Sequence, residues 1–290
     1  MPATEADGAA TMSARAAAQL DAAVRDAGDL ALAMFGKPIR QWTKGPSSSP
    51  VCEADIAVDG LLRERLAGGD DRFGWLSEET ADDDARLTAR YVWVIDPIDG
   101  TRAYIAGEPD WAISAALVEN GRPIAACLYA PALDEFFAAR AGGASTLNGK
   151  AIAATRGADL QGLRIAGPQK LMERLSSVMP PFTKLPRGHS LALRLVRVAQ
   201  GACDAAFAGG NSHDWDLAAA DLLVHQAGGA LTPLSGEQSR IIVPCHGTEC
   251  LSQPAETGTR RSSSVLGTNA SPRWSDSNIR IRIRQLSCEC

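Results

Sequence analysis

An apolar run that ends in two aspartates constrains this chain more than any other segment. Residues 91–95 are aromatic and β-branched, which predicts a buried strand, and Asp96-Pro-Ile-Asp99-Gly100-Thr101 follows at once. The proline and the glycine predict a tight turn between and after the two carboxylates. Carboxylates at the end of a rigid strand can hold Mg²⁺, which prefers hard oxygen ligands. Gly100 would also let the two backbone amides after Asp99 approach a phosphate oxygen.

From the residues alone, two other interpretations of this segment are possible. Asp-Pro-x-Asp-Gly also fits an ordinary turn capped by aspartates. A strand followed by Asp-x-Asp-Gly-Thr is typical of haloacid-dehalogenase phosphatases. In this chain the nucleophile position of that signature is Pro97, which cannot attack phosphorus, so the spacing excludes that class.

Two further acidic segments lie elsewhere in the chain. Glu78-Glu79 follows a predicted strand at residues 73–76, and Asp214-Trp-Asp216 begins a predicted helix. Taken singly, an acidic pair is usually exposed, and an aspartate in a first helical turn is usually a cap. Their meaning therefore depends on whether the fold brings them to Asp96 and Asp99.

Hydrophobic periodicity predicts a chain of mixed helices and strands. Apolar residues recur at helical spacing over 12–35 and 54–67. Segments 112–118, 124–130 and 135–139 are typical of an antiparallel sheet. After the turn at Asn148-Gly149, helices and strands alternate: a strand at 163–166, helices at 169–178 and 190–200, a strand at 202–208, and a helix at 214–227 closed by Gly228-Gly229.

Composition excludes several classes of function. The net charge of −5 gives no reason to expect binding to a nucleic-acid polymer, and no apolar run is long enough to span a bilayer. The first ten residues lack the basic and apolar regions of a secretory signal, so we expect a cytoplasmic protein. Cys52, Cys127 and Cys203 are expected to be small buried hydrophobes, and the four tail cysteines do not fit a standard zinc pattern.

Taken together, the motifs resemble the inositol monophosphatase superfamily. They are an acidic pair, the Asp-Pro-Ile-Asp-Gly-Thr segment, Trp-Asp-x-Ala-Ala-Ala and Ala-Gly-Gly, and the resemblance runs from about residue 44 to residue 234. It implies an α/β (α+β) fold, a layered αβαβα sandwich with two subdomains. We expect an N-terminal subdomain over 1–150 with most metal ligands and a C-terminal subdomain over 151–239.

The resemblance also implies a role for each acidic residue. One Mg²⁺ ion would be held by Glu78, Asp96 and the carbonyl of Ile98, and a second by Asp96, Asp99 and Asp216. Asp55 would lie near a third, more weakly held ion. Thr101, hydrogen-bonded to Glu78 or its neighbour, would help to deprotonate the attacking water. The resemblance further implies inhibition by Li⁺, and it allows a homodimer without showing an interface.

The substrate is a small phosphate monoester that the residues do not identify uniquely. Residues 75–80 and 211–216 are most similar to the bacterial 3'(2'),5'-bisphosphate nucleotidase branch, whose enzymes act on adenosine 3',5'-bisphosphate, a by-product of sulfate assimilation. Gly209 stands where inositol enzymes usually carry an acidic residue. Gly188, His189 and Ser190, with Gly100 and Thr101, are the expected substrate contacts, and the start of the following helix would favour a second phosphate. Inositol monophosphatase, fructose bisphosphatase and a non-catalytic phosphate-binding homologue stay open.

The end of the chain departs from this pattern. Residues 240–290 are rich in serine, threonine and arginine, and no amphipathic helix is recognisable there. Such a composition favours an atypical, disordered tail, because it cannot offset the entropy of ordering.

Overall fold

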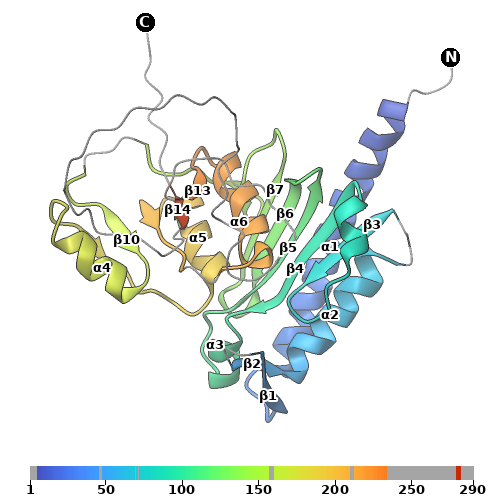
Figure 1. The fold of residues 1–290 in the computed structure, drawn as a ribbon, viewed down its shortest axis with the longest axis horizontal. Coiled ribbons are helices and arrows are strands. Elements are labelled where there is room, and N and C mark those ends of the chain that lie inside the picture. Colours follow the sequence, from blue (N-terminus) through green and yellow to red (C-terminus); the bar gives the residue numbers. More distant parts are fainter. Residues whose placement is uncertain are drawn as a thin grey trace, which may run out of the picture.

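A seven-stranded mixed sheet forms the centre of the computed structural model (Figure 1). The structure describes residues 5–45, 48–68, 70, 72–156, 160–209, 212–233 and 279–281. The strands follow one another in space as they do in sequence: β3 (Phe73–Ser77), β4 (Tyr91–Asp99), β5 (Ala112–Glu119), β6 (Arg122–Ala130), β7 (Glu135–Arg140), β8 (Thr146–Leu147) and β9 (Lys150–Ala151). β3 and β4 are parallel, and every later pair is antiparallel.

Helices cover both faces of this sheet, which explains why β4 is apolar throughout. Trp93 and Ile95 pack into a cluster with α1 (Glu5–Met34) and α2 (Glu53–Leu66). Val92 and Val94 point to the other face, toward α5 (Leu191–Ala199) and α6 (Asp214–Gln226). Alternate residues of a strand point to opposite faces, so a sheet covered on both sides has no polar face.

A small parallel sheet and one helix complete the layers. Its strands lie in the order β11 (Thr183–Lys184), β10 (Arg164–Ala166), β12 (Ala205–Ala206). Ile165 packs with Met172 of α4 (Gln169–Ser176), whereas Ala166 belongs to the cluster that contains α5 and α6. The order of layers is helix, sheet, helix, sheet, helix, which confirms the predicted αβαβα class.

Short elements join these layers. A hairpin of β1 (Gln41–Lys44) and β2 (Ser49–Cys52) precedes α2, and α3 (Thr101–Ala106) follows β4. The 3₁₀ turns η1 (Asp84–Thr88) and η2 (Pro131–Leu133) precede β4 and β7. β13 (Leu231–Pro233) pairs antiparallel with β14 (Ile279–Ile281).

Two local predictions need correction. The tight turn expected between Asp96 and Asp99 is wrong, because β4 continues through Asp99 and only its register against β5 shifts there. The chain turns one residue later, at Gly100, whose φ of 100° suits glycine. The strand expected at 202–208 is reduced to β12, and the side chain of Asp204, just before it, accepts a hydrogen bond from the Arg164 amide.

Other expectations are confirmed or stay open. The side chains of Cys52, Cys127 and Cys203 are buried, as expected. The subdomain boundary near residue 150 stays a prediction, and one hydrophobic cluster contains residues from both sides of it.

The predicted tail lies outside the described residues except for β14. Among the described helices, none combines the length and apolar character needed to cross a bilayer.

Candidate metal centre

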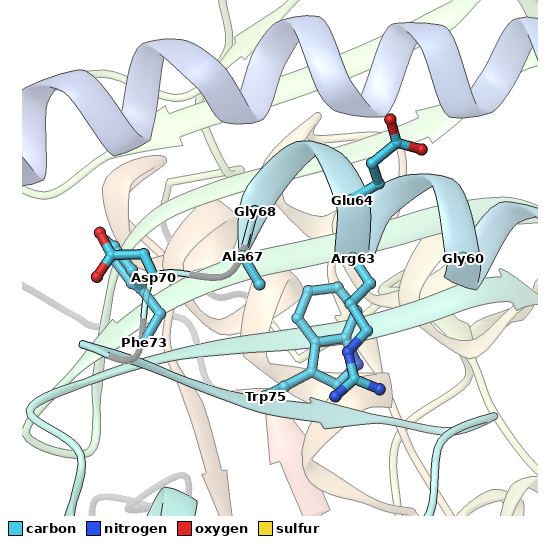
Figure 2. A pocket seen from close by; sticks show the side chains of 8 residues that line it. All are labelled: Gly60, Arg63, Glu64, Ala67, Gly68, Asp70, Phe73 and Trp75. Carbon is cyan, nitrogen blue, oxygen red and sulfur yellow. The ribbon is translucent and has the colours of Figure 1, made fainter.

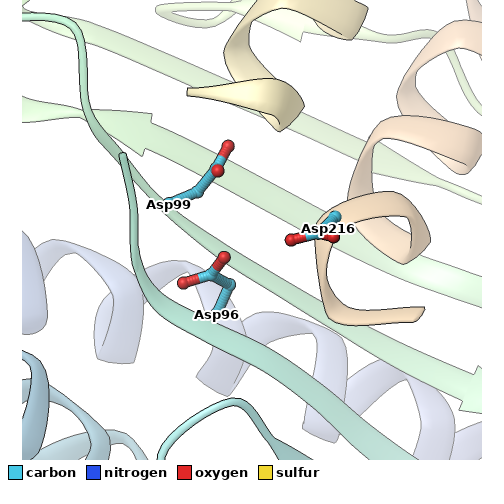
Figure 3. A group of neighbouring side chains, drawn as sticks. All are labelled: Asp96, Asp99 and Asp216. Carbon is cyan, nitrogen blue, oxygen red and sulfur yellow. The ribbon is translucent and has the colours of Figure 1, made fainter. Parts of the chain in front are cut away.

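Three carboxylates from two distant parts of the chain meet at one edge of the central sheet. Asp96 and Asp99 lie at the end of β4, and Asp216 lies in the first turn of α6 (Figure 3). One oxygen from each lies within 4.8 Å of the others. Asp96 and Asp99 are buried and Asp216 is half-buried. The fold therefore gathers the oxygen donors that the sequence had placed about 120 residues apart.

This cluster is short of positive charge. The Oδ1 atom of Asp96 is buried with no hydrogen-bond partner in the described part of the chain. Burial, followed by the charges of Glu78, Asp99 and Asp216, raises the pKa of Asp96 well above its ordinary value. A buried carboxylate without a partner is costly, and a cation would relieve that cost. The three carboxylates, one of which has an oxygen without a hydrogen-bond partner, are the kind of ligands that Mg²⁺ prefers.

The start of α5 holds Asp99 in place. Its Oδ2 atom accepts hydrogen bonds from the Ser190 hydroxyl and the Ala192 amide, both at 2.6 Å. Burial raises the pKa of Asp99 to about 6, although these hydrogen bonds favour the charged form. Asp216 is held differently, because its Oδ2 atom accepts from the His213 amide at 2.7 Å. Both aspartates are thus oriented by the beginning of a helix.

Glu78 lies beside this cluster and contacts a lysine that sequence analysis missed. The Nζ atom of Lys44 lies 3.2 Å from Glu78 Oε1 and 2.6 Å from Glu79 Oε1. Lys44 also donates to the Glu78 carbonyl at 2.9 Å. Burial raises the pKa of Glu79 to about 7 despite this ammonium group. Nothing in the loop-like sequence after Lys44 indicated that the lysine would turn toward the acidic pair.

Asp55 and Thr101 form a pair, which corrects the predicted partner of the threonine. The Thr101 hydroxyl lies 3.0 Å from Asp55 Oδ1 and 3.0 Å from the Ile98 carbonyl, rather than on Glu78 or Glu79. Asp55 Oδ2 accepts from the amide and the thiol of Cys52, both at 2.8 Å. The reason is the position of Asp55 in the first turn of α2, which lies next to the start of α3.

A cavity of about 200 Å³ opens over this cluster. It is lined by Ser49, Pro50, Glu78, Asp96, Ile98, Asp99, Gly100, Thr101, Arg102, His189 and Asp216. The remaining predicted residues, Asp55, Gly188 and Ser190, are not on its wall, and Asp55 and Ser190 instead bond to residues that are. A larger hollow of about 650 Å³ lies between α2 and β3, over Arg63 and Trp75 (Figure 2). Its carboxylates, Glu64 and Asp70, lie apart, so the chemistry favours the smaller cavity.

The backbone amides at and just before the start of α5 already donate hydrogen bonds to side chains of the protein. Asp110 Oδ2 accepts from the amides of His189 and Ser190, the second at 3.3 Å. The Ala192 amide donates to Asp99, and the Leu193 amide donates to Ser190 Oγ at 3.0 Å. This weighs against the expectation that the helix start itself binds a second phosphate. His189 is exposed, and its Nε2 atom lies 3.3 Å from Glu108 Oε2.

A buried arginine near the carboxylates was also missed. Arg194 of α5 is only 7% exposed, and its Nε and Nη1 atoms have no partner within the described chain. Burial, and then the charge of Arg187, lowers the pKa of Arg194 to about 10, whereas the charges of Asp99, Asp110 and Asp216 raise it. The available signal was an arginine among the apolar residues of a helix that is buried nearly all round.

Comparison with known proteins places the chain among phosphatases. Over 218 residues it is 30% identical to an inositol-1-monophosphatase of Mesorhizobium japonicum, covering 68% of this chain and 77% of the relative. Over 222 residues it is 34% identical to a histidinol-phosphatase of Mycobacterium tuberculosis, covering 72% and 84%. The solved structure of the extragenic suppressor protein SuhB from Bartonella henselae is similar with a TM-score of 0.68 and 28% identity, over 75% of this chain and 87% of that one.

The family assignment rests on the longest of these matches. The sequence model of the Inositol monophosphatase family matches residues 12–264, so the similarity extends beyond residues 44 to 234 at both ends. The matched range contains every carboxylate of the cluster described above. The chain therefore belongs to the inositol monophosphatase family and is a phosphatase of that family.

Proposed function

We propose that this protein is a Mg²⁺-dependent phosphomonoesterase that prefers a small substrate carrying a second phosphate. Our first candidate is adenosine 3',5'-bisphosphate, from which the 3'-phosphate would be removed. The observation that carries this preference is Arg194, a buried guanidinium with two unpartnered nitrogens beside the carboxylate cluster. Burying a guanidinium with unpartnered nitrogens is costly, and although Arg194 does not line the cavity, its charge would favour a substrate that carries a second phosphate.

The proposed ligands for the metal are those of the cluster. Glu78, Asp96 and the Ile98 carbonyl would hold one ion, and Asp96, Asp99 and Asp216 would hold another. Asp55 would lie near a third. Bound Mg²⁺ would supply an activated water and charge stabilisation for the phosphate oxygens. The gathering of Asp96, Asp99 and Asp216 within 4.8 Å supports this assignment.

Thr101 and Asp55 are the proposed path for the proton of the attacking water. The Thr101 hydroxyl can donate to Asp55 Oδ1, which leaves its oxygen free to accept from a water. Burial raises the pKa of Asp55, so this carboxylate is a stronger base than an exposed aspartate. Glu78, which lines the cavity, is the second candidate base.

The position of Gly209 supports a substrate other than a polyol. Glycine at position 209 offers no carboxylate where inositol enzymes usually carry an acidic residue that grips ring hydroxyls, and a side chain built there would meet no described atom within 4 Å. Arg187, exposed just before α5, adds a second positive charge that acts on Arg194. Two arginines close to each other, with no acidic residue at position 209, favour an anionic ligand over a neutral one.

Inositol 1-phosphate is the second candidate because a relative is named for it. Histidinol phosphate, suggested by another relative, carries an ammonium group that Arg194 would repel. Fructose 1,6-bisphosphate has a second phosphate, so Arg194 does not discriminate against it. A non-catalytic homologue would bind phosphate esters without releasing phosphate.

The test measures phosphate release from the four esters with Mg²⁺, by wild type and two arginine variants. We expect the highest kcat/KM for adenosine 3',5'-bisphosphate. Arg194→Gln should lower that value by at least about tenfold, ~1.4 kcal/mol, and change the value for inositol 1-phosphate by less than about threefold. Arg197→Gln is the matched control, because Arg197 lies on the same helix but is paired with Glu135 at 2.6 Å.

Three results would contradict the proposal. A tenfold or greater preference for inositol 1-phosphate would overturn the second-phosphate assignment and leave the metal chemistry intact. An equal loss on all substrates in Arg194→Gln would assign that arginine to the fold. No phosphate release from any ester would favour the non-catalytic homologue.

Inhibition by Li⁺ is a separate test. Insensitivity to Li⁺ would separate this enzyme from the behaviour implied by the family resemblance.

A further inference from the structure

The segment between α3 and β5 holds the start of α5 against the end of β4. Asp110, in this segment, accepts hydrogen bonds from the amides of His189 and Ser190 through one carboxylate oxygen. Ser190 in turn donates from its hydroxyl to Asp99. A continuous series of hydrogen bonds thus runs from Asp110 through the start of α5 to a carboxylate of the candidate metal centre.

Two glycines show how closely this segment is packed. A side chain at Gly100, the residue after Asp99, would place its first carbon 2.8 Å from the Asp110 carbonyl and 3.2 Å from the Ser190 amide. A side chain at Gly188 would place its first carbon 2.7 Å from Asp110 Oδ2, at a φ of 66°. Asp110 therefore contacts both ends of the junction, with its backbone at Gly100 and its carboxylate at residues 188–190.

We propose that Asp110 is a positioning residue for the phosphatase reaction, which holds the first turn of α5 so that Ser190 and Ala192 keep Asp99 oriented toward the metal. This inference rests on the proposed function, because it takes Asp99 as a ligand of Mg²⁺. Asp110 is absent from the wall of the cavity and would act only through its hydrogen bonds. Nothing in the sequence pattern around Glu108-Pro-Asp110 indicated this role.

The exposure of Asp110 and His189 bears on whether Asp110 stabilises the fold or only positions Asp99. Asp110 is half-buried, and the His189 residue that it bonds is exposed, so water can replace the carboxylate when it is removed. The fold should therefore survive the substitution. Asp99 is buried and depends on two donors from this helix turn, so a small displacement of the turn changes its orientation.

The experiment compares Asp110→Ala, Asp110→Asn and Asp83→Ala with wild type. Asp83→Ala is the matched control, since Asp83 caps the short helix η1 by accepting from the Ala85 amide at 2.9 Å. Three quantities are measured for each protein: the thermal midpoint in EDTA, the Mg²⁺ dissociation constant by calorimetry, and kcat and KM for the best substrate.

We expect Asp110→Ala to weaken Mg²⁺ binding and to lower kcat, each by about tenfold, as removal of a group that orients a metal ligand usually does. KM should change by less than about threefold, because Asp110 touches no substrate. The EDTA midpoint should stay within a few degrees of wild type. Asp110→Asn should recover most of the loss, because its amide oxygen can accept the same two hydrogen bonds.

Unchanged Mg²⁺ affinity and kcat in Asp110→Ala would overturn the positioning role. A change in KM alone would make Asp110 a substrate contact, and equal losses in Asp83→Ala would make the effect one of stability; either result rejects the proposal. The calorimetric arm does not need activity. If wild type releases no phosphate yet Asp110→Ala still weakens Mg²⁺ binding, the proposed function fails while the positioning role stands.

Discussion

Two buried aspartates in this molecule have opposite electrostatic surroundings. Asp204, between β10 and β12, accepts from the backbone amide, the Nε atom and the Nη2 atom of Arg164 at 2.7–3.1 Å. These hydrogen bonds lower its pKa. Asp96, at the end of β4, faces other carboxylates, its Oδ1 atom has no hydrogen-bond partner among the described residues, and its pKa is raised. A carboxylate that the fold has paired is structural, whereas one that it has left among like charges marks the place of an external cation.

The strongest way to break this comparison is Asp96→Asn. Asp96 is the ligand proposed to bridge two ions, so loss of its charge should lower kcat/KM by at least about 100-fold, ~2.7 kcal/mol. The measurement is steady-state phosphate release at saturating Mg²⁺. A variant that keeps more than about a tenth of wild-type turnover would rule out the bridging role.

The same variant has a second readout that does not depend on activity. In EDTA, wild type must either bury the Asp96 charge against the repulsion of Glu78, Asp99 and Asp216 or hold a proton on Asp96, and both cost free energy. The asparagine removes that repulsion, so the metal-free variant should be at least as stable as wild type in urea unfolding. Lower stability of the metal-free variant would indicate that Asp96 is needed by the fold itself.

Asp204→Asn should have the opposite pair of effects. It breaks the ion pair to Arg164 and leaves part of the guanidinium unpaired, at a cost of about 1–3 kcal/mol in the free energy of unfolding. Since Asp204 lies away from the carboxylate cluster, kcat below the melting range should stay within about threefold of wild type. A large loss of kcat with normal stability would place Asp204 in the catalytic machinery and end the comparison.

The smallest expected effect is a pH dependence that Mg²⁺ should reduce. The pKa of Asp99 is raised to about 6, so the metal-free folded state holds a proton that the unfolded chain has released near pH 4. Its stability should therefore fall as pH rises from about 4 through about 6. Paired carboxylates such as Asp204, with a lowered pKa, lose their contribution only below this window.

Urea midpoints at pH 4, 5, 6 and 7, in EDTA and in saturating Mg²⁺, measure this dependence. We expect the EDTA midpoint to fall between about pH 4 and about pH 6 and the Mg²⁺ midpoint to fall less. Burial raises the pKa of Asp221 to about 6 as well, but Asp221 is not part of the cluster. Its contribution to the pH dependence should therefore be the same in EDTA and in Mg²⁺, and only the contribution of the cluster should differ. An EDTA midpoint that rises with pH would contradict the raised pKa of the cluster.

Much of the fold was predictable because it follows from local pattern. The alternation that buries both faces of β4, the helical spacing of α1 and α2, and the glycine after α6 each depend on residues close in sequence. One exception was the turn expected at Pro97, and another was the strand expected at 202–208, of which only β12 forms. A proline can be accommodated where the ladder is irregular, and the register shift between Asp96 and Asp99 is such a place.

The candidate site was predictable in its residues and not in its contacts. The family resemblance of the motifs implied that Asp96, Asp99 and Asp216 would share a site, and the structure brings them together. The partner of Thr101 was wrong because Asp55 and Thr101 are 46 residues apart and meet only when α3 lies on the start of α2. No periodicity encodes such an encounter.

The sequence by itself determined which residue types could carry the chemistry and on which elements they lie. Only the tertiary structure decided which charges are paired. It placed Lys44 against Glu78 and Glu79, left two nitrogens of the buried Arg194 without a partner among the described residues, and set Asp110 on the start of α5. The physical reason is that a side chain's pairing depends on distances between elements separated in sequence, whereas helices and strands arise largely from near neighbours.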